Sequence, residues 1–300
     1  MNIDLHIAGY RIRLTEALDS PCISWPLHPF GAFLDRSGHH PDIEIAITIV
    51  EELPNLPHGS LHFDACHGLW RLYESAAGLL LESLDTKTYQ PCARALITKD
   101  FSHVDVWTRG EEVGSVLGWV PMKIINPIAE VCLLTKLARE GGLLLHSAGV
   151  FAPTGGYIFT GASGAGKSTL SGFFADRGLS VLSDERMIIR QTGKEFVMYG
   201  TPWIGSGAYA KNESGLLTEL FCIRHGYSHH VEHMTPGAVL SWVLPQCFLP
   251  HWDRAAMEST LAFLNGLIRH IPCRSLAFAK DPNVVDYVQG QCATPAAVAS

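Results

Sequence analysis

The sequence predicts an α/β domain preceded by a β-rich domain, and three patterns indicate this fold class. Residues 156–160 form an apolar strand pattern, residues 161–169 a glycine-rich loop and residues 170–177 a helical pattern that ends at Gly178. A second apolar strand pattern follows at 179–183, so strands and a helix alternate here. The chain before residue 120 instead alternates apolar and polar residues in short runs, which is typical of β-strands. We therefore predict domains over residues 1–120 and 121–300.

Several strands are expected in the N-terminal domain. Residues 3–8 and 10–14 alternate around Gly9, and further strand patterns cover 42–49, 60–63, 69–73, 78–84, 93–97 and 104–108. No catalytic constellation is visible among them. Recognition of a substrate or partner and a purely structural role both remain open for this domain.

The α/β domain is expected to begin with a helix that has Asn126 as its N-cap and Pro127 at its first helical position. A strand at 143–150 carries His146. After the second apolar strand, patterns predict strands at 186–190, 195–199, 216–223 and 274–279, and helices at 235–244, 253–271 and 281–288. Asp253 is the expected N-cap of the second of these helices.

The glycine-rich loop fits the phosphate-loop pattern G-x-x-x-x-G-K-[ST]. Glycines let several N–H groups point at one anion, and the helix that follows carries partial positive charge at its N-terminus. Lys167 is expected to reach the β- and γ-phosphates, and the Ser168 hydroxyl to hold Mg²⁺. The predicted nucleotide-binding residues are Gly161, Ala162, Ser163, Gly164, Ala165, Gly166, Lys167, Ser168 and Thr169.

Two acids, Asp184 and Glu185, follow the strand at 179–183. In a parallel α/β sheet, ligands bind beyond the carboxyl ends of the strands, so we expect these acids beside the phosphate loop. A Mg²⁺ ion would then be shared by Ser168 and one of the acids, and Asp184 would accept the proton of an attacking hydroxyl.

The order of His146, the phosphate loop and the paired acid resembles the bacterial HPr kinase/phosphorylase family, which is related in fold to the ATP-dependent phosphoenolpyruvate carboxykinases. The resemblance covers residues 126–190 most clearly. It implies an α/β P-loop kinase domain with a serine kinase-like active site, and it suggests a homo-oligomer. The resemblance also implies that Asp184 takes the position of the family's catalytic aspartate and that His146 lies near the γ-phosphate.

The chain also departs from the family pattern. Glu185 stands where the second acid is usually Asp, Ser168-Thr169 replaces Ser-Glu after the loop lysine, and the phosphorylase signature is not recognisable after Arg190. HPr as the substrate and the reverse reaction therefore stay open. The chain looks more like the shorter, divergent kinase relatives found beside peptide-modification genes.

The sequence thus predicts an ATP-dependent kinase that transfers the γ-phosphate to a hydroxyl of a peptide, a protein or a small molecule. Its catalytic residues would be Asp184, His146 and Lys167. A nucleotide-dependent ATPase or switch without an acceptor, and a degenerate nucleotide-binding module, are the alternatives. The choice between ATP and GTP is open because no base-reading motif is visible.

The glycine-rich segment 200–207 permits two interpretations, a lid over the nucleotide and an ordinary loop with a packed Trp203. Lys211 and Arg224 are candidates for neutralising phosphate, with surface roles as the alternative. Some histidines have no metal-site spacing and are best interpreted as solvent-exposed: His39, His40, His225, His229, His230 and His233.

Composition excludes some functions. The net charge is −7 and no Lys/Arg cluster is visible, which argues against a nucleic-acid binder. No apolar run reaches the roughly 18 residues needed to span a bilayer, and no leader pattern opens the chain. The eight cysteines include no C-x-x-C, which favours a reduced, cytoplasmic protein.

Overall fold

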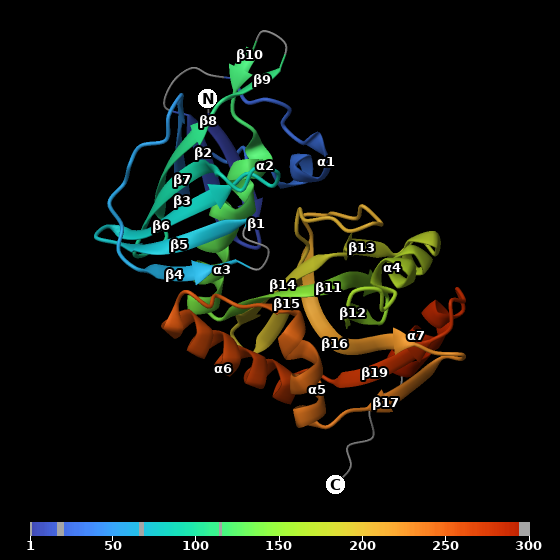
Figure 1. Cartoon of the computed structure of the whole chain (residues 1–300). Coiled ribbons are helices and arrows are strands. Elements are labelled where there is room, and N and C mark those ends of the chain that lie inside the picture. Colours follow the sequence, from blue (N-terminus) through green and yellow to red (C-terminus); the bar gives the residue numbers. More distant parts are fainter. Residues whose placement is uncertain (1, 17–20, 66–68, 114–115, 294–300) are drawn as a thin grey trace. The chain divides into compact units, whose positions relative to one another are not determined.

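The computed structural model describes residues 2–16, 21–65, 69–113 and 116–293 (Figure 1). The chain divides into two compact units. Unit 1 comprises Met1–Arg139 and Pro250–Met257, and unit 2 comprises Glu140–Leu249 and Glu258–Ser300. Residue 120, where the domain division was predicted, lies inside unit 1.

Unit 1 contains one eight-stranded sheet with the order β1-β2-β3-β8-β7-β6-β5-β4. Its strands pair antiparallel except for the parallel pairs β2–β3 and β3–β8. Alternate residues such as Leu5, Ile12 and Ile45 are fully buried, which explains the period-two pattern in the sequence. The strands are β1 (Asn2–Ile7), β2 (Tyr10–Glu16), β3 (Ile43–Val50), β4 (Leu61–Asp64), β5 (Trp70–Ser75), β6 (Gly78–Leu84), β7 (Pro91–Thr98) and β8 (His103–Arg109), with a separate ladder of β9 (Glu111–Val113) and β10 (Val116–Gly118).

The helical segment predicted to begin at Asn126 begins earlier, at Pro121. Pro121 opens α2 (Pro121–Ile124), a π-type turn covers Ile125–Ala129, and α3 (Glu130–Arg139) follows. Asn126 has φ −115° and ψ 115°. This extended conformation is the one favoured for a residue before proline, so Asn126 interrupts the helical segment instead of capping its start. A short helix, α1 (Leu27–Phe30), and a 3₁₀ helix (Gly31–Phe33) lie earlier in the chain.

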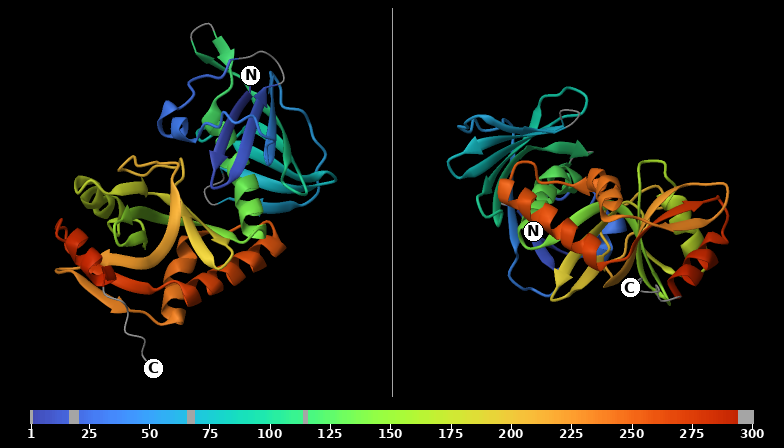
Figure 2. Two further views of the ribbon diagram at one scale, coloured as in Figure 1. Left: turned by 180° about the vertical axis from the view of Figure 1, so that it is seen from behind. Right: turned by 90° about the horizontal axis from the view of Figure 1, so that it is seen from below.

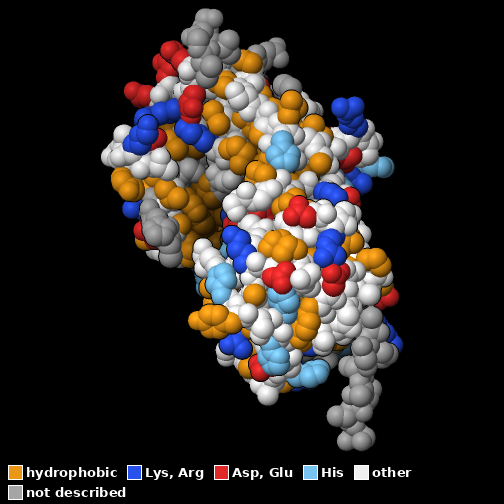
Figure 3. All heavy atoms as spheres, turned by 90° about the vertical axis from the view of Figure 1, so that its right-hand side faces the viewer, with side chains coloured by type: hydrophobic (Ala, Val, Ile, Leu, Met, Phe, Trp, Pro, Cys, Tyr) orange, Lys and Arg blue, Asp and Glu red, His pale blue; other side chains and the backbone are white. Residues whose placement is uncertain are grey.

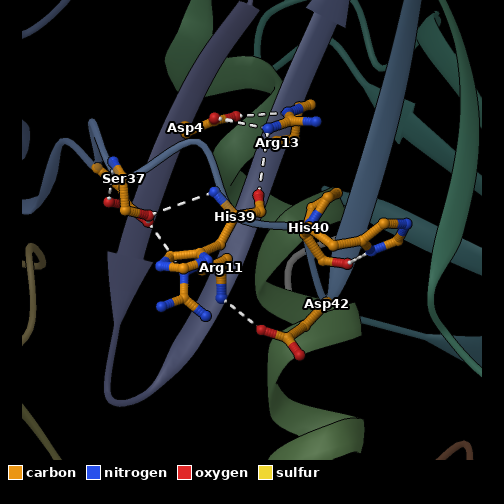
Figure 4. A network of polar contacts seen from close by, with 9 residues as sticks. Asp4, Arg11, Arg13, Ser37, His39, His40 and Asp42 are labelled. Carbon is orange, nitrogen blue, oxygen red and sulfur yellow. Dashed lines mark hydrogen bonds and ion pairs between the residues drawn. The ribbon is translucent and has the colours of Figure 1, made fainter.

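Polar contacts lie within the first hairpin of unit 1 and join it to the loop before β3 (Figure 4). The ion pair between Arg11 of β2 and Asp35, at 3.1 Å, reaches that loop. Arg13 donates two hydrogen bonds to Asp4, at 2.7 and 2.8 Å, and one to the main-chain oxygen of His39 at 3.4 Å. His39 and His40 are exposed, as predicted. Ion pairs at such partly exposed positions stabilise the fold little, because solvent screens the two charges.

Unit 2 contains a nine-stranded sheet in which seven strands follow the order β12-β11-β14-β15-β16-β19-β17. The other two strands, β13 and β18, each pair with β11. The long strand β16 also pairs with β12, so β11, β12, β16, β15 and β14 form a closed ring of paired strands. The strands are β11 (Gly142–Ala152), β12 (Gly155–Thr160), β13 (Ser180–Ser183), β14 (Arg186–Thr192), β15 (Glu195–Tyr199), β16 (Ser214–His225), β17 (His230–His233), β18 (Cys247–Phe248) and β19 (Cys273–Phe278).

Helices cover both faces of this sheet (Figures 1 and 2). One buried cluster joins Ile158 to α5 (Pro236–Val243) and α6 (Arg254–His270). The first residues of α6, up to Met257, belong to unit 1. The other cluster joins the neighbouring residues Tyr157 and Phe159 to α4 (Lys167–Asp176) and α7 (Val284–Ala293). Because successive strand residues point to opposite faces, β12 is buried on both sides and appears in the sequence as a continuous apolar run. None of the described helices is long and apolar enough to cross a membrane.

The arrangement of β12 and β13 corrects the parallel sheet assumed from the sequence. Both strands pair with β11, and both run antiparallel to it. They therefore run parallel to each other, and their last residues, Thr160 and Ser183, lie opposite Ser147 and Gly149 on β11. The loop after β12 and the acids after β13 consequently emerge at the same place, with His146 on the strand between them.

Candidate active site

A cavity of about 410 Å³ in unit 2 brings most of the predicted site residues together. Its lining includes Lys167 and Ser168 of the phosphate loop, both acids and His146. Ser163, Gly164, Gly166 and Thr169 also line it, together with two residues that were not predicted as site residues, Ser206 and His225.

The phosphate loop turns into α4 at Gly166, which has φ +101°. A Cβ at this position would lie 2.8 Å from Cζ of Phe278, so both the backbone conformation and the space require glycine. No side chain caps the start of α4. The first N–H groups of a helix have no partner within the helix, so this end can bind an anion such as a phosphate.

Lys167 is the first residue of α4 and its side chain is nearly buried, with 6% of its surface exposed. Its Nζ donates to the main-chain oxygens of Gly161 at 2.8 Å and Ala162 at 3.3 Å. Burial lowers the pKa of Lys167, and the nearby Glu185 carboxylate opposes this shift. The ammonium is thus held within the loop itself, in the cavity that a phosphate would enter.

Asp184 is held by the glycine-rich segment that follows β15. The carboxylate is 1% exposed and accepts hydrogen bonds from the N–H groups of Gly205 at 3.0 Å and Gly207 at 2.7 Å. A Cβ on Gly207 would lie 2.8 Å from Oδ2 of Asp184, so only glycine allows this approach. Segment 200–207 therefore supports the acid.

Trp203, Lys211 and Arg224 are not among the described residues that line the cavity. Trp203 is 6% exposed, and the guanidinium of Arg186 lies 5.4 Å from its ring centroid. Lys211 donates to the Ser180 hydroxyl at 2.8 Å, and Arg224 pairs with a glutamate of β17 at 3.7 Å. The structure thus matches the packed-tryptophan interpretation of this segment, and it gives the two cations surface roles.

His146 connects β11 to the acids. Its Nδ1–H donates to the main-chain oxygen of Glu185 at 3.0 Å, and Oε1 of the same residue lies 3.5 Å from Nδ1. Burial and the charge of Lys167 lower the pKa of His146, whereas the Glu185 carboxylate raises it less. The ring is therefore held neutral with its proton on Nδ1, which leaves Nε2 as a hydrogen-bond acceptor.

This shift predicts a pH-dependent contribution to stability. Because the pKa of His146 is lowered on folding, the unfolded chain binds more protons as the pH falls below about 6.5. Above that pH the ring is neutral in both states and its full contribution to folding stability is present. As the pH falls from there towards the lower pKa of the folded state, this contribution is lost. We expect the melting temperature of wild type relative to His146→Gln to fall between about pH 7 and pH 5. A difference that stays constant over this range, measured by thermal unfolding, would contradict the assignment.

His225 is a site residue that the sequence did not reveal. It ends β16, and its Nε2–H donates to the main-chain oxygen of Gly164 at 2.7 Å. Its register partner on β19 is Phe278, the residue that packs against Gly166. Together these two side chains support the phosphate loop. His225 reaches the loop because β16 pairs in parallel with β12, the strand that leads into the loop. No local pattern in the sequence reveals this pairing.

The remaining histidines of segment 225–233 show no arrangement for a metal. His230 and His233 are exposed, and histidine side chains are scattered over the surface in the lower half of Figure 3. Within the described part of the chain, no group of three or more His, Cys, Asp or Glu residues could hold a metal ion. His230 and His233 thus match the prediction of solvent exposure, whereas His229 does not. Its side chain is only 14% exposed, because its ring lies beside Tyr287 and its Nε2 lies 3.6 Å from Oδ2 of Asp281.

Mg²⁺ does not need a cluster of three or more protein side chains, so the predicted ligands Ser168, Asp184 and Glu185 do not have to form one. Mg²⁺ is usually bound by one or two carboxylates together with phosphate and water oxygens, not by a cage of protein ligands. Ser168, Asp184 and Glu185 line one cavity and offer only hard oxygen donors. This donor set fits Mg²⁺.

No family model and no curated protein matches this chain. Among solved structures, it is similar to the Hpr(Ser) kinase/phosphatase from Coxiella burnetii. The alignment covers 49% of this chain and 91% of that chain, with 12% sequence identity and a TM-score of 0.29. A similarity this weak does not establish the family.

Proposed function

We propose that this protein is an ATP-dependent kinase that transfers the γ-phosphate to a hydroxyl group, with a serine of a peptide or protein, or a small alcohol, as the acceptor. One observation carries the proposal. A single cavity is lined both by a phosphate loop with Lys167 and Ser168 and by Asp184, Glu185 and His146. These are the parts that phosphoryl transfer needs, because positioning and charge stabilisation supply most of its rate.

Each residue has a distinct role in this proposal. The loop amides and the start of α4 bind the phosphates, and Lys167 stabilises the charge that develops on them. Mg²⁺, when bound through Ser168 and one of the acids, neutralises phosphate charge. Asp184 is oriented by two main-chain N–H groups and accepts the proton of the acceptor hydroxyl. His146 holds the Glu185 main chain beside it and presents an unprotonated Nε2.

The fate of a labelled γ-phosphate tests this function. The full chain is incubated with Mg²⁺, γ-labelled ATP and a mixture of serine-containing peptides, free serine and small alcohols. Label on a hydroxyl acceptor is the expected result, and GTP in place of ATP measures nucleotide preference. Label that appears only as inorganic phosphate would instead indicate an ATPase or switch. Absence of nucleotide binding by calorimetry would indicate a degenerate site.

A further inference from the structure

One hydroxyl that lines the cavity belongs to the segment whose main chain binds Asp184. Ser206 lies between Gly205 and Gly207, whose N–H groups both bind Asp184. The main chain on each side of Ser206 is therefore fixed relative to the Asp184 carboxylate. Ser206 itself is exposed, and it lines the same cavity as Lys167.

The other hydroxyls that line the cavity, Ser163, Ser168 and Thr169, belong to the phosphate loop and the first turn of α4. A hydroxyl there contacts phosphate or metal as part of the binding loop. The acceptor of a phosphoryl group must instead reach a base, because its proton has to leave as the new bond forms. Among the cavity-lining residues that the structure describes, Ser206 is the hydroxyl placed on the same segment that holds the base.

We propose that Ser206 is a self-phosphorylation site, an inference that rests on the proposed kinase function. Oγ of Ser206 forms a bond to the γ-phosphorus while the bond from that phosphorus to the bridging oxygen of ADP breaks. The hydroxyl proton passes to the Asp184 carboxylate. The products are ADP and a phosphoserine, and no other reactant is needed.

The test uses the full chain with ATP and Mg²⁺ and without any added acceptor. Peptide mapping by mass spectrometry is expected to place one phosphoryl group on residue 206. Because the acceptor is in the same molecule, the initial rate per molecule is expected to be independent of protein concentration. Ser206→Ala is expected to lose this phosphate, and Ser206→Thr, which restores a hydroxyl, to carry it on residue 206. Ser228→Ala is the control, since Ser228 is exposed but does not line the cavity.

The possible failures are distinguishable. If residue 206 stays unmodified while the wild-type protein phosphorylates an added acceptor, the inference is overturned and the kinase function stands. If residue 206 stays unmodified while the protein only releases phosphate, the inference is overturned and the protein is an ATPase or switch. A rate per molecule that rises with protein concentration would show transfer between molecules and overturn the intramolecular step. If the chain neither binds nucleotide nor turns it over, the proposed function and the inference fail together. Melting temperature and nucleotide affinity of Ser206→Ala show whether the variant is folded.

Discussion

Lys167→Met is expected to reduce phosphoryl transfer by roughly 10²- to 10³-fold, the loss typical when one preorganised electrostatic group is removed. Methionine is chosen because Lys167 is nearly buried, so alanine would also leave a cavity. The variant keeps most of the volume of the stem and removes the charge. Nucleotide affinity is expected to fall as well, since in the proposed mechanism the ammonium contacts the phosphates before and during transfer.

The stability of this variant separates a functional from a structural role. Burial lowers the pKa of Lys167, which means that the folded state destabilises the ammonium relative to the unfolded chain. Replacing it with methionine removes this desolvation cost together with the two hydrogen bonds from Nζ to the main-chain oxygens of Gly161 and Ala162. Because these two effects oppose each other, we expect only a small change in melting temperature. Lys194→Met, in the exposed turn between β14 and β15, is the matched control and should retain full transfer. A Lys167→Met protein that transfers phosphate at the wild-type rate would remove the basis of the proposed site.

The parts of the site that the sequence predicted are those encoded locally. The phosphate loop, its flanking strand and helix, and the acids after β13 each lie within one short segment, where spacing and periodicity suffice. Lys167 and Asp184 do line one cavity, as expected, although β11 runs antiparallel between β12 and β13. The prediction that the loop and the acids lie together requires only that β12 and β13 run in the same direction. Two strands that both pair antiparallel with β11 run in the same direction, just as two directly paired parallel strands do.

The parts that the sequence missed depend on contacts between distant segments. His225 reaches Gly164 because β16 pairs with β12, and a strand's neighbour cannot be identified from its own apolar pattern. For segment 200–207 the sequence left two interpretations open, a lid over the nucleotide and an ordinary loop with a packed Trp203. Here Gly205 and Gly207 permit close approach to the Asp184 carboxylate. Glycine in a sequence does not distinguish close approach from the motion of a lid, since both require the absence of a side chain.

The same contacts make Asp184→Asn the second decisive variant. Asparagine has nearly the same shape, but its amide cannot accept a proton from an attacking hydroxyl. We expect transfer to fall by roughly 10²- to 10⁴-fold, the range associated with general acid–base catalysis. Nucleotide affinity measured without Mg²⁺ should stay near the wild-type value, because the phosphate loop is unchanged. The additional affinity that Mg²⁺ confers tests which acid binds the ion: it should decrease if Asp184 is the carboxylate ligand and stay unchanged if Glu185 is.

A structural side effect must be separated from this result. The two oxygens of Asp184 accept N–H groups from Gly205 and Gly207, and the amide nitrogen of asparagine cannot accept either bond. A bond to a charged acceptor contributes about 1.5–3 kcal/mol, so the melting temperature of Asp184→Asn should fall modestly. Asp176→Asn makes the same chemical change at an exposed position of α4 and should change neither transfer nor stability appreciably. If Asp184→Asn stays folded, binds nucleotide and still transfers phosphate at the full rate, the base is another group. His146, whose Nε2 is unprotonated in the neutral ring, would then be the residue to substitute next.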